Sequence, residues 1–362
     1  MPLRADTEVK QQMSPKFTIG IPTYNRAGFL REALGFAVGQ TLEDLEVVVS
    51  DNASTDDTAE VAHEAGCRVR YFRNPANIGQ WANFRKAVEL AKGEYFSWLQ
   101  DDDALHCEFA RRAYDVLESM PDVVAYISYA VNGPSLSSIH FTPLYGPPFA
   151  VDWLRSVPRR IDGKLVAPLS LMMSVAIPPT IAFRTSILRE YLGLMDGKSP
   201  LYTERSVLAA VASRGSIVVD PRVGGFFREH AEQSWRAMWK DRRNDMTQWE
   251  DMAWTVQRTM SSWDESWKDA LRSELRKCPA VYRERWRQSA QSWPCDSWLC
   301  TAVKEILEAD LPPLSPTQHT PSASSKVANA LGIATISASL WQKTRRAGRR
   351  VICLCTGFRH KP

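Results

Sequence analysis

The chain has 362 residues, of which 44% are hydrophobic and 24% charged, a composition typical of globular proteins. Its first residues, MPLRADTEVKQQ, contain no apolar stretch, and no run of about 18 apolar residues follows, so neither a signal peptide nor a membrane-spanning helix is expected. Seven cysteines without CxxC spacing predict free thiols and exclude a structural zinc site of the usual pattern. These features favour a cytoplasmic protein.

The charge is distributed unevenly along the chain. The formal net charge is +4, but residues 1–310 carry −4 and residues 311–362 carry +8. In the tail, basic residues alternate with apolar ones such as Trp341 and Phe358. A tail of this kind can lie on an anionic membrane surface or on nucleic acid, although no nucleic-acid partner is expected here. A disordered, solubilising tail explains the same composition equally well.

Short β-rich runs alternate with helix-like segments between residues 17 and 129, which predicts βα units around a mainly parallel sheet flanked by helices. The predicted strands cover residues 17–22, 45–50, 69–73, 94–100 and 123–128. The predicted helices cover residues 26–40, 57–66, 79–93 and 106–119, and several of them end at a glycine.

Polar residues follow four of these strands. They are Tyr24-Asn25, Asp51-Asn52, Arg73-Asn74 and the acidic triplet Asp101–Asp103. In an open α/β sheet, ligands bind outside the carboxyl ends of the strands, so these residues are expected at one site. Three carboxylates suit a hard divalent cation, which usually completes its shell with phosphate oxygens of the substrate. The pattern therefore predicts a phosphate-bearing substrate.

The second half of the chain is less regular. Residues 130–180 are rich in Pro, Gly and Ser and are expected to form loops over the site. A strand at 179–186, a helix at 204–215, a strand at 216–220 and the FFREH segment (226–230) follow. Residues 231–310 predict a helical, Trp-rich extension, for which a compact aromatic core is favoured over a polyprenyl- or sugar-facing surface. Residues 311–325 form a Pro/Ser-rich linker to the basic tail.

The motifs FTIGIPTYNRAGFLREAL, LEVVVSDNASTDDT and NPANIGQWANFRKAVELAKGEYFSWLQDDD occur in this order. Together with LYTERSVLAAVASRG and FFREH, this set resembles the inverting glycosyltransferases of family 2, whose nucleotide-binding fold is called GT-A. The resemblance covers about residues 16–230. Together with the patterns above, it divides the chain into an N-terminal extension (1–15), a GT-A domain (16–230), a helical extension (231–310), and a linker with a basic tail (311–362).

The resemblance assigns several residues to nucleotide-sugar binding. They are Pro22, Thr23, Tyr24, Asn25, Asp51, Arg73, Asn77, Asp101 and Asp102. Asp51 would accept a hydrogen bond from the base, while Arg73 and Asn77 would lie near the base and the ribose.

The resemblance also implies a divalent metal, Mn²⁺ or Mg²⁺, held by Asp102, Asp103 and His230. Simple DxD spacing selects Asp101 and Asp103 instead, whereas alignment of the preceding strand selects Asp102. Gln100 stands where many family members carry another acid. The choice between these aspartates stays open on the sequence.

The catalytic base of an inverting enzyme removes a proton from the acceptor hydroxyl. In the family this base opens a helix that ends in glycine about eleven residues later, and counting back from Gly215 gives Glu204, where Asp is usual. Arg228 and His230 match the Arg-x-His of the family. Arg184, Arg205 and Arg228 are candidates for contacts with phosphate or an acidic sugar.

The expected function is metal-dependent, inverting transfer of a sugar from a nucleotide-diphosphate donor, by preference a UDP-sugar, to a glycan or lipid-linked acceptor hydroxyl. Bacterial members of the family often build cell-surface polysaccharide, so a peripheral position on the inner face of the plasma membrane is expected. A sugar nucleotidyltransferase is disfavoured because PTYNRAG stands where such enzymes carry a Gly-rich basic loop. A non-catalytic nucleotide-sugar-binding protein stays open as a second alternative.

Overall fold

The computed structural model describes residues 14–140, 158–164, 166–167, 178–196, 203–231 and 233, with a few isolated positions beyond residue 268. The chain divides into two compact units, Met1–Trp267 and Lys268–Pro362, and the helices and strands named below belong to the first. The predicted N-terminal extension, the Trp-rich extension, the linker and the basic tail lie almost wholly outside the described residues.

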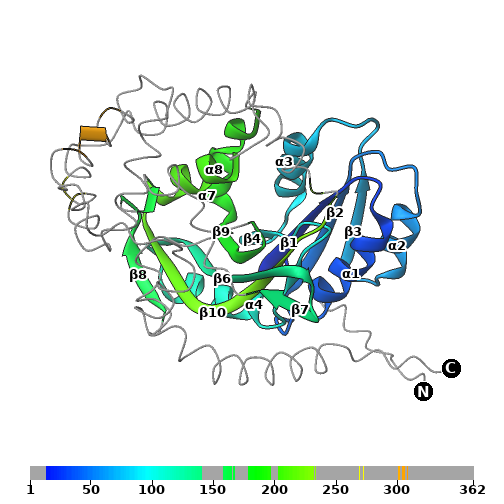
Figure 1. The fold of residues 1–362 in the computed structure, drawn as a ribbon, viewed down its shortest axis with the longest axis horizontal. Coiled ribbons are helices and arrows are strands. Elements are labelled where there is room, and N and C mark those ends of the chain that lie inside the picture. Colours follow the sequence, from blue (N-terminus) through cyan, green and yellow to red (C-terminus); the bar gives the residue numbers. More distant parts are fainter. Residues whose placement is uncertain are drawn as a thin grey trace, which may run out of the picture. The chain divides into compact units, whose positions relative to one another are not determined.

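One sheet of ten strands organises the described part of the first unit (Figure 1). Its strands are β1 (Phe17–Thr23), β2 (Leu45–Asp51), β3 (Val69–Arg73), β4 (Tyr95–Trp98), β5 (Ala104–Leu105), β6 (Val123–Ser135), β7 (Ser138–His140), β8 (Arg159–Asp162), β9 (Ile181–Arg184) and β10 (Ser216–Arg228). The order across the sheet is β3-β2-β1-β4-β9-β6-β10-β5, with β7 paired to β6 and β8 paired to β10.

The sheet is mainly parallel along its long strands, as predicted. β1 pairs in parallel with both β2 and β4, β2 with β3, and β6 with β10. β9 lies between β4 and β6 and is antiparallel to both, so the strands on its two sides run in the same direction. All carboxyl ends of β1 to β4 therefore point to the same edge of the sheet.

Helices cover both faces of this sheet. They are α1 (Ala27–Val38), α2 (Thr58–Glu64), α3 (Gln80–Leu90), α4 (Phe109–Ser119), α7 (Thr185–Glu190) and α8 (Thr203–Ala212), with 3-10 turns η1 (Pro178–Thr180) and η2 (Leu192–Asp196). The apolar residues of α1, α2 and α4 share one core with the inward side chains of the sheet. The helices α3, α7 and α8 lie on the other side (Figure 1).

Burial explains why the central strands could be predicted from their apolar sequence pattern. In β1, Phe17, Ile19 and Ile21 are fully buried against one set of helices, while Gly20 faces the other side, where a Cβ atom would lie 2.6 Å from the ring of Phe96. A central strand covered on both faces reads as an almost continuous apolar run.

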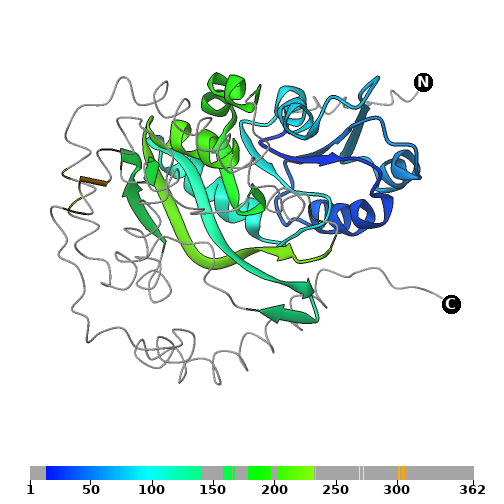
Figure 2. The same cartoon turned by 45° about the horizontal axis from the view of Figure 1, so that its top comes forward.

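Three strands, β5, β7 and β8, were not predicted, and neither were the continuations of β6 beyond residue 128 and of β10 beyond residue 220. The segment 130–135 continues β6, and residues 138–140 and 159–162 form β7 and β8, so the expectation of loops throughout 130–180 is wrong for these residues. β6 extends because its partner β10 runs beside it to Arg228, as the long curved pair in Figure 2 shows. β5 pairs with Gly225 and Phe226 directly after the acidic triplet.

Within the described residues, no helix is long and apolar enough to cross a membrane. The two described cysteines, Cys67 and Cys107, are free, as predicted.

Candidate functional site

The register of the sheet brings three polar strand ends side by side. Thr23 pairs with Asp51 across β1 and β2, and Asp51 pairs with Arg73 across β2 and β3. Asp51 is 1% exposed. A buried carboxylate is costly without donors, so the groups around it define the local structure.

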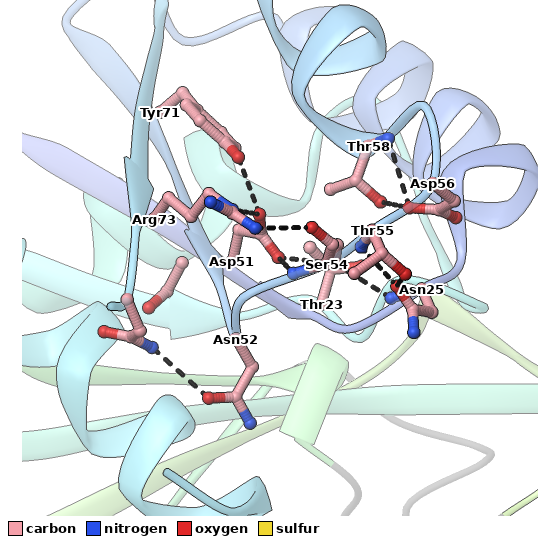
Figure 3. A network of polar contacts seen from close by, with 12 residues as sticks. Thr23, Asn25, Asp51, Asn52, Ser54, Thr55, Asp56, Thr58, Tyr71 and Arg73 are labelled. Atoms are coloured by element: carbon pink, nitrogen blue, oxygen red, sulfur yellow. Dashed lines mark hydrogen bonds and ion pairs between the residues drawn. The ribbon is translucent and has the colours of Figure 1, made fainter. Parts of the chain in front are cut away.

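Four donor groups converge on the carboxylate of Asp51 (Figure 3). Its Oδ1 accepts the backbone N–H of Ser54 at 2.9 Å and the Ser54 hydroxyl at 2.5 Å. Its Oδ2 accepts the hydroxyl of Tyr71 at 2.6 Å and lies 3.6 Å from Arg73 Nε. Burial, together with the hydrogen bond to Asp51, raises the pKa of Tyr71, so its hydroxyl stays a donor.

The loops after β1 and β2 are tied to each other. The backbone N–H of Asn25 donates to Ser54 Oγ at 2.9 Å, and the Thr55 N–H donates to Asn25 Oδ1 at 2.7 Å. Asn25 has a φ of 51° and Ala53 a φ of 68°. Asn adopts this left-handed conformation more readily than most residues. The two loops thus form one rigid rim at the sheet edge.

Four asparagine side chains, those of Asn52, Asn74, Asn77 and Asn83, form a hydrogen-bonded cluster at the same edge. Asn52 Nδ2 donates to Asn77 Oδ1 at 2.8 Å, and Asn52 Oδ1 accepts the N–H of Ile78 at 2.9 Å. The buried Asn83 of α3 accepts from Ser50 Oγ at 2.8 Å and from Asn74 Nδ2 at 2.9 Å. The segment 74–79 is therefore fixed against the end of β2.

The acidic triplet follows β4 at the same edge. Thr23 Oγ1 donates to Asp101 Oδ2 at 2.8 Å. Arg26 Nη1 lies 3.2 Å from Asp101 Oδ1 and 2.9 Å from Asp102 Oδ2, and His230 Nε2 lies 2.9 Å from the same Asp102 oxygen. Burial and then the charge of Asp102 raise the pKa of Asp101 to about 6. Basic side chains thus stand on either side of Asp102.

Asp103 faces the end of β10. Its Oδ1 accepts the backbone N–H of Arg228 at 2.9 Å, while its Oδ2 is buried without a hydrogen-bond partner among the residues described. Burial, followed by the charge of Asp102, raises the pKa of Asp103 well above its ordinary value. A buried oxygen of this kind is open to a further ligand.

One face of α1 holds the Arg-x-His segment in place. The guanidinium of Arg228 donates to Glu32 at 2.6 Å and to the carbonyl of Asp102 at 2.8 Å, and it lies 5.5 Å from the ring centroid of Phe29. The same ring is 4.9 Å from the imidazole of His230. Phe29 and Glu32 are one turn apart, so a single helix face contacts both basic residues.

The donor set suits a divalent cation, although its present arrangement does not form a metal cluster. Carboxylates and an imidazole are ligands that Mn²⁺ or Mg²⁺ accept, and the unpartnered Asp103 oxygen is available. Among the described residues, no group of three or more His, Cys, Asp or Glu side chains is arranged to hold a metal. Arg26 occupies the position between two of the carboxylates.

The structure brings most of the predicted residues to this edge. Pro22 lies in β1 opposite Ser50, and Tyr24, which is 45% exposed, follows directly after β1. Glu204 lies in the first turn of α8, and the chain passes through Gly215 into β10. A Cβ atom at Gly215 would lie 2.5 Å from the carbonyl oxygen of Asp122, which explains the glycine there.

Arg184, a candidate for contact with phosphate or an acidic sugar, lies away from this edge of the sheet. It pairs with Tyr95, the first residue of β4, and so lies at the opposite edge of the sheet from Asp101. Its guanidinium donates to the carbonyls of Leu117, Met120 and Val123. It satisfies backbone groups at the end of α4.

Sequence reasoning missed four residues that build the site. They are Arg26, Ser54, Tyr71 and Asn83. Three of these stand within the quoted motifs, in TYNRAG, SDNAST and NPANIGQWANF, so their position was a usable signal. The pairing of Tyr71 with Asp51 depends on strand register, which the sequence does not reveal.

Comparison with known proteins shows which family this chain matches. Residues 18–192 match the family model described as glycosyl transferase family 2. An uncharacterized glycosyltransferase of Rickettsia typhi is 32% identical over 131 residues. A GalNAc(5)-diNAcBac-PP-undecaprenol beta-1,3-glucosyltransferase of Campylobacter jejuni is 38% identical over 96 residues, and the abequosyltransferase RfbV of Salmonella typhimurium is 37% identical over 109 residues.

These matches cover 35%, 25% and 28% of this chain, and 41%, 31% and 33% of the three relatives. The chain thus spans less than half of each relative. Among solved structures, the fold is similar to that of S. aureus TarS in complex with UDP, with a TM-score of 0.55, 15% identity, and coverage of 82% of this chain and 83% of that chain. Residues 18–192 of this chain therefore belong to glycosyl transferase family 2 and are built on its GT-A fold.

Proposed function

We propose that this protein is a metal-dependent, inverting glycosyltransferase that uses a nucleotide-diphosphate sugar. The observation that carries the proposal is the carboxyl edge of the sheet, where a donor-satisfied carboxylate, Asp51, and an acidic triplet with an open oxygen stand at the ends of neighbouring strands. The family match over residues 18–192 supports glycosyl transfer as the chemistry. The donor is a UDP-sugar in this proposal.

The nucleotide is proposed to bind over the rim formed by the first two loops. Tyr24 is exposed there, and Asp51, held by Ser54 and Tyr71, would accept a hydrogen bond from the base. Arg73 donates to the carbonyl of Ser54 at 2.8 Å, so the same cation supports both the loop and the carboxylate. Pro22, Thr23, Asn25, Asn77 and Asp101 complete the nucleotide-sugar contacts.

The diphosphate is proposed to lie beside Asp102, Asp103 and His230, which would hold Mn²⁺ or Mg²⁺. When bound, the cation would neutralise negative charge that grows on the departing diphosphate. The protein residues do the positioning: Phe29 orients the His230 ring, and the Arg228 N–H fixes Asp103. Asp102, between Arg26 and His230, is the carboxylate of the three best placed for this role.

Glu204 is proposed as the base that takes the proton of the acceptor hydroxyl while that oxygen attacks the anomeric carbon and the diphosphate leaves. One displacement of this kind inverts the anomeric centre. The support for Glu204 is its place in the first turn of α8, eleven residues before Gly215, which directly precedes β10.

The acceptor is proposed to be a glycan or lipid-linked hydroxyl in the synthesis of cell-surface polysaccharide. The C. jejuni relative is named for a PP-undecaprenol-linked substrate. The basic tail after residue 310 would bring the protein to the anionic inner face of the plasma membrane, with the enzyme on the cytoplasmic side.

A screen of nucleotide sugars tests the proposal directly. We expect one donor class to raise the melting temperature of the protein in the presence of Mn²⁺ or Mg²⁺, and to be hydrolysed slowly when no acceptor is present. EDTA should remove both effects. If no nucleotide sugar or nucleoside diphosphate shifts the melting temperature with either metal, the proposed function is wrong.

A further inference from the structure

Arg26 supplies positive charge that offsets two carboxylates of the acidic triplet, Asp101 and Asp102. Its Nη1 lies within 3.2 Å of Asp101 and 2.9 Å of Asp102. The side chain of Arg26 is 25% exposed, against 7% for Asp101 and 11% for Asp102. Ion pairs buried to this extent are weakly screened by salt and solvent, so the guanidinium is a strong counter-charge for both carboxylates.

The triplet keeps other hydrogen-bond partners that do not depend on this guanidinium. Asp101 accepts from Thr23, Asp102 contacts His230, and Asp103 accepts the backbone N–H of Arg228. The main contribution of Arg26 to the triplet is therefore charge rather than shape.

Arg26 is also dispensable for the start of α1. Its side chain makes no capping hydrogen bond, and the Ala27 N–H instead donates to Asp56 Oδ2 at 2.9 Å. The backbone carbonyl of Arg26 accepts from Leu30, which any residue at this position can do. A substitution of the side chain should leave the helix intact.

A guanidinium and a divalent cation need the same oxygens. The Asp102 oxygen that accepts from Arg26 is also the one that contacts His230, the residue assigned to the metal. Two cations within a few ångströms of each other repel strongly in a partly buried site. Burial opposes the charge of Arg26, but Asp101 and Asp102 outweigh it and raise its pKa, so the guanidinium stays charged.

We propose that Arg26 competes with the divalent cation for Asp101 and Asp102, so that the free protein binds metal weakly and binds it tightly only together with the nucleotide diphosphate. The inference rests on the glycosyltransferase function proposed above. A diphosphate adds negative charges that offset both cations at once. Because coupling between two ligands is reciprocal, the metal must then raise the affinity for the nucleotide by the same factor.

The test measures Mn²⁺ binding to the metal-free full chain by electron paramagnetic resonance of the free ion, without nucleotide. We expect Arg26→Gln to bind Mn²⁺ roughly tenfold more tightly than the wild type, because a like charge beside the ligands is removed. Arg26→Lys should stay near the wild type, since it keeps the charge. Arg31→Gln is the matched control: Arg31 lies on α1, is 59% exposed and pairs with Glu64.

Equal or weaker Mn²⁺ binding by Arg26→Gln overturns the proposal, and so does an equal gain in Arg26→Lys. A role of Arg26 in structure alone would lower Mn²⁺ affinity and melting temperature together, whereas competition predicts a larger Mn²⁺-induced rise in melting temperature in Arg26→Gln.

A second measurement needs no variant. Wild-type Mn²⁺ affinity is compared with and without each of UDP, GDP and dTDP, after binding of each nucleotide has been measured separately. We expect at least a tenfold gain with the nucleotide that binds. A nucleotide that binds but leaves the Mn²⁺ affinity unchanged contradicts the competition. Failure of all nucleotides to bind would instead refute the proposed function, and the comparison of Arg26 variants with Mn²⁺ alone would still test the competition.

Discussion

At the scale of single residues, the site depends on how buried carboxylates find donors. Asp51 is satisfied by Ser54, Tyr71 and Arg73, whereas one oxygen of Asp103 has no such donor among the described residues. The first carboxylate is rigid and the second is open to a ligand. This difference separates the base-binding half of the proposed site from its metal-binding half.

Removing the Tyr71 hydroxyl should destabilise the part of the site around Asp51 that is proposed to bind the base. Tyr71→Phe deletes a hydrogen bond to a carboxylate, so we expect a loss of roughly 1.5 kcal/mol in the free energy of unfolding, measured by urea denaturation. The affinity for the nucleotide should fall as well. Tyr114→Phe is the control, because the described contacts of Tyr114 are made by its ring. Equal effects of the two changes would contradict the assigned role of Tyr71.

The raised pKa of Asp101 predicts an unusual pH dependence. Its pKa is about 6 in the folded protein against an ordinary value of 3.8, so the folded state binds this proton more tightly than the unfolded state. The contribution of Asp101 to the free energy of unfolding should therefore fall as the pH rises from about 4 to about 6, and level off above that.

Urea denaturation of the metal-free protein across this pH range checks the prediction. Asp101→Asn should show a shallower fall in stability, although Asp103, whose pKa is raised as well, keeps part of it. An identical pH slope in the variant and the wild type would show that Asp101 does not titrate in this window.

Glu204 is testable by an isosteric change. Glu204→Gln keeps the size of the side chain but cannot accept the acceptor proton, so we expect transfer to drop by at least about 100-fold. Metal-dependent nucleotide binding should be unchanged, because the base is proposed to act on the acceptor alone. Transfer rates and nucleotide affinity together distinguish this result from misfolding. Unchanged transfer would remove Glu204 from the mechanism.

At residue scale, the sequence predicted those contacts that follow from position in a motif. Thr23, Asp51, Asp102 and His230 were all named in advance and all lie at one edge of the sheet. Arg26 was missed because an arginine after a strand has many uses, and only the folded chain shows which carboxylates it reaches.

At the scale of elements, the long parallel pair β6 and β10 extends to the site. Each has 13 residues, and their pairing carries Arg228 to the acidic triplet. Close approach of the two strands requires Gly224, where a Cβ atom would lie 1.8 Å from Ser128 Oγ.

Two glycine substitutions should therefore have opposite effects on stability. Gly224→Ala forces β6 and β10 apart and should cost about 2 kcal/mol or more. Gly35→Ala, on the exposed face of α1 with nothing within 4 Å of the new methyl group, should stabilise the protein by roughly 0.5 kcal/mol. Melting temperatures of both variants check the pair. Two changes of the same sign would mean that the strand contact is not as tight as described.

The strands that the sequence revealed are those with a continuous apolar run, such as β1 and β2. β5, β8 and the far half of β6 were missed because each is short or polar and exists through pairing with a distant partner, whereas β7 is a three-residue strand that pairs with the end of β6 directly before it. Ala104 and Leu105, for example, pair with residues more than 100 positions later in the chain. Local pattern carries no information about such partners.

At the scale of the whole molecule, the charge is uneven: residues 1–310 carry −4 and residues 311–362 carry +8. This distribution predicts that the basic tail binds anionic membranes. Deleting residues 343–362 removes most of the +8 charge of the tail. We expect the truncated protein to lose binding to vesicles that contain anionic lipid, measured by flotation, and to keep its nucleotide affinity. Binding of the full chain should weaken with salt.

The control for this deletion is a set of neutral vesicles, which neither form should bind strongly. The full chain could instead fail to bind anionic vesicles and show a salt-sensitive affinity for DNA that the deletion abolishes. That result would mean that the tail binds nucleic acid.

The hydrogen bond from Arg228 to Asp103 joins residues 125 positions apart, and this separation has a consequence for the order of synthesis. The strands β1 to β4 and the triplet leave the ribosome well before β10 exists. Until Arg228 arrives, the nascent chain holds three neighbouring acids with Arg26 as their nearest described counter-charge. Refolding of the full chain should therefore quicken in mildly acidic buffer, which reduces the repulsion among these carboxylates before β10 pairs with β6.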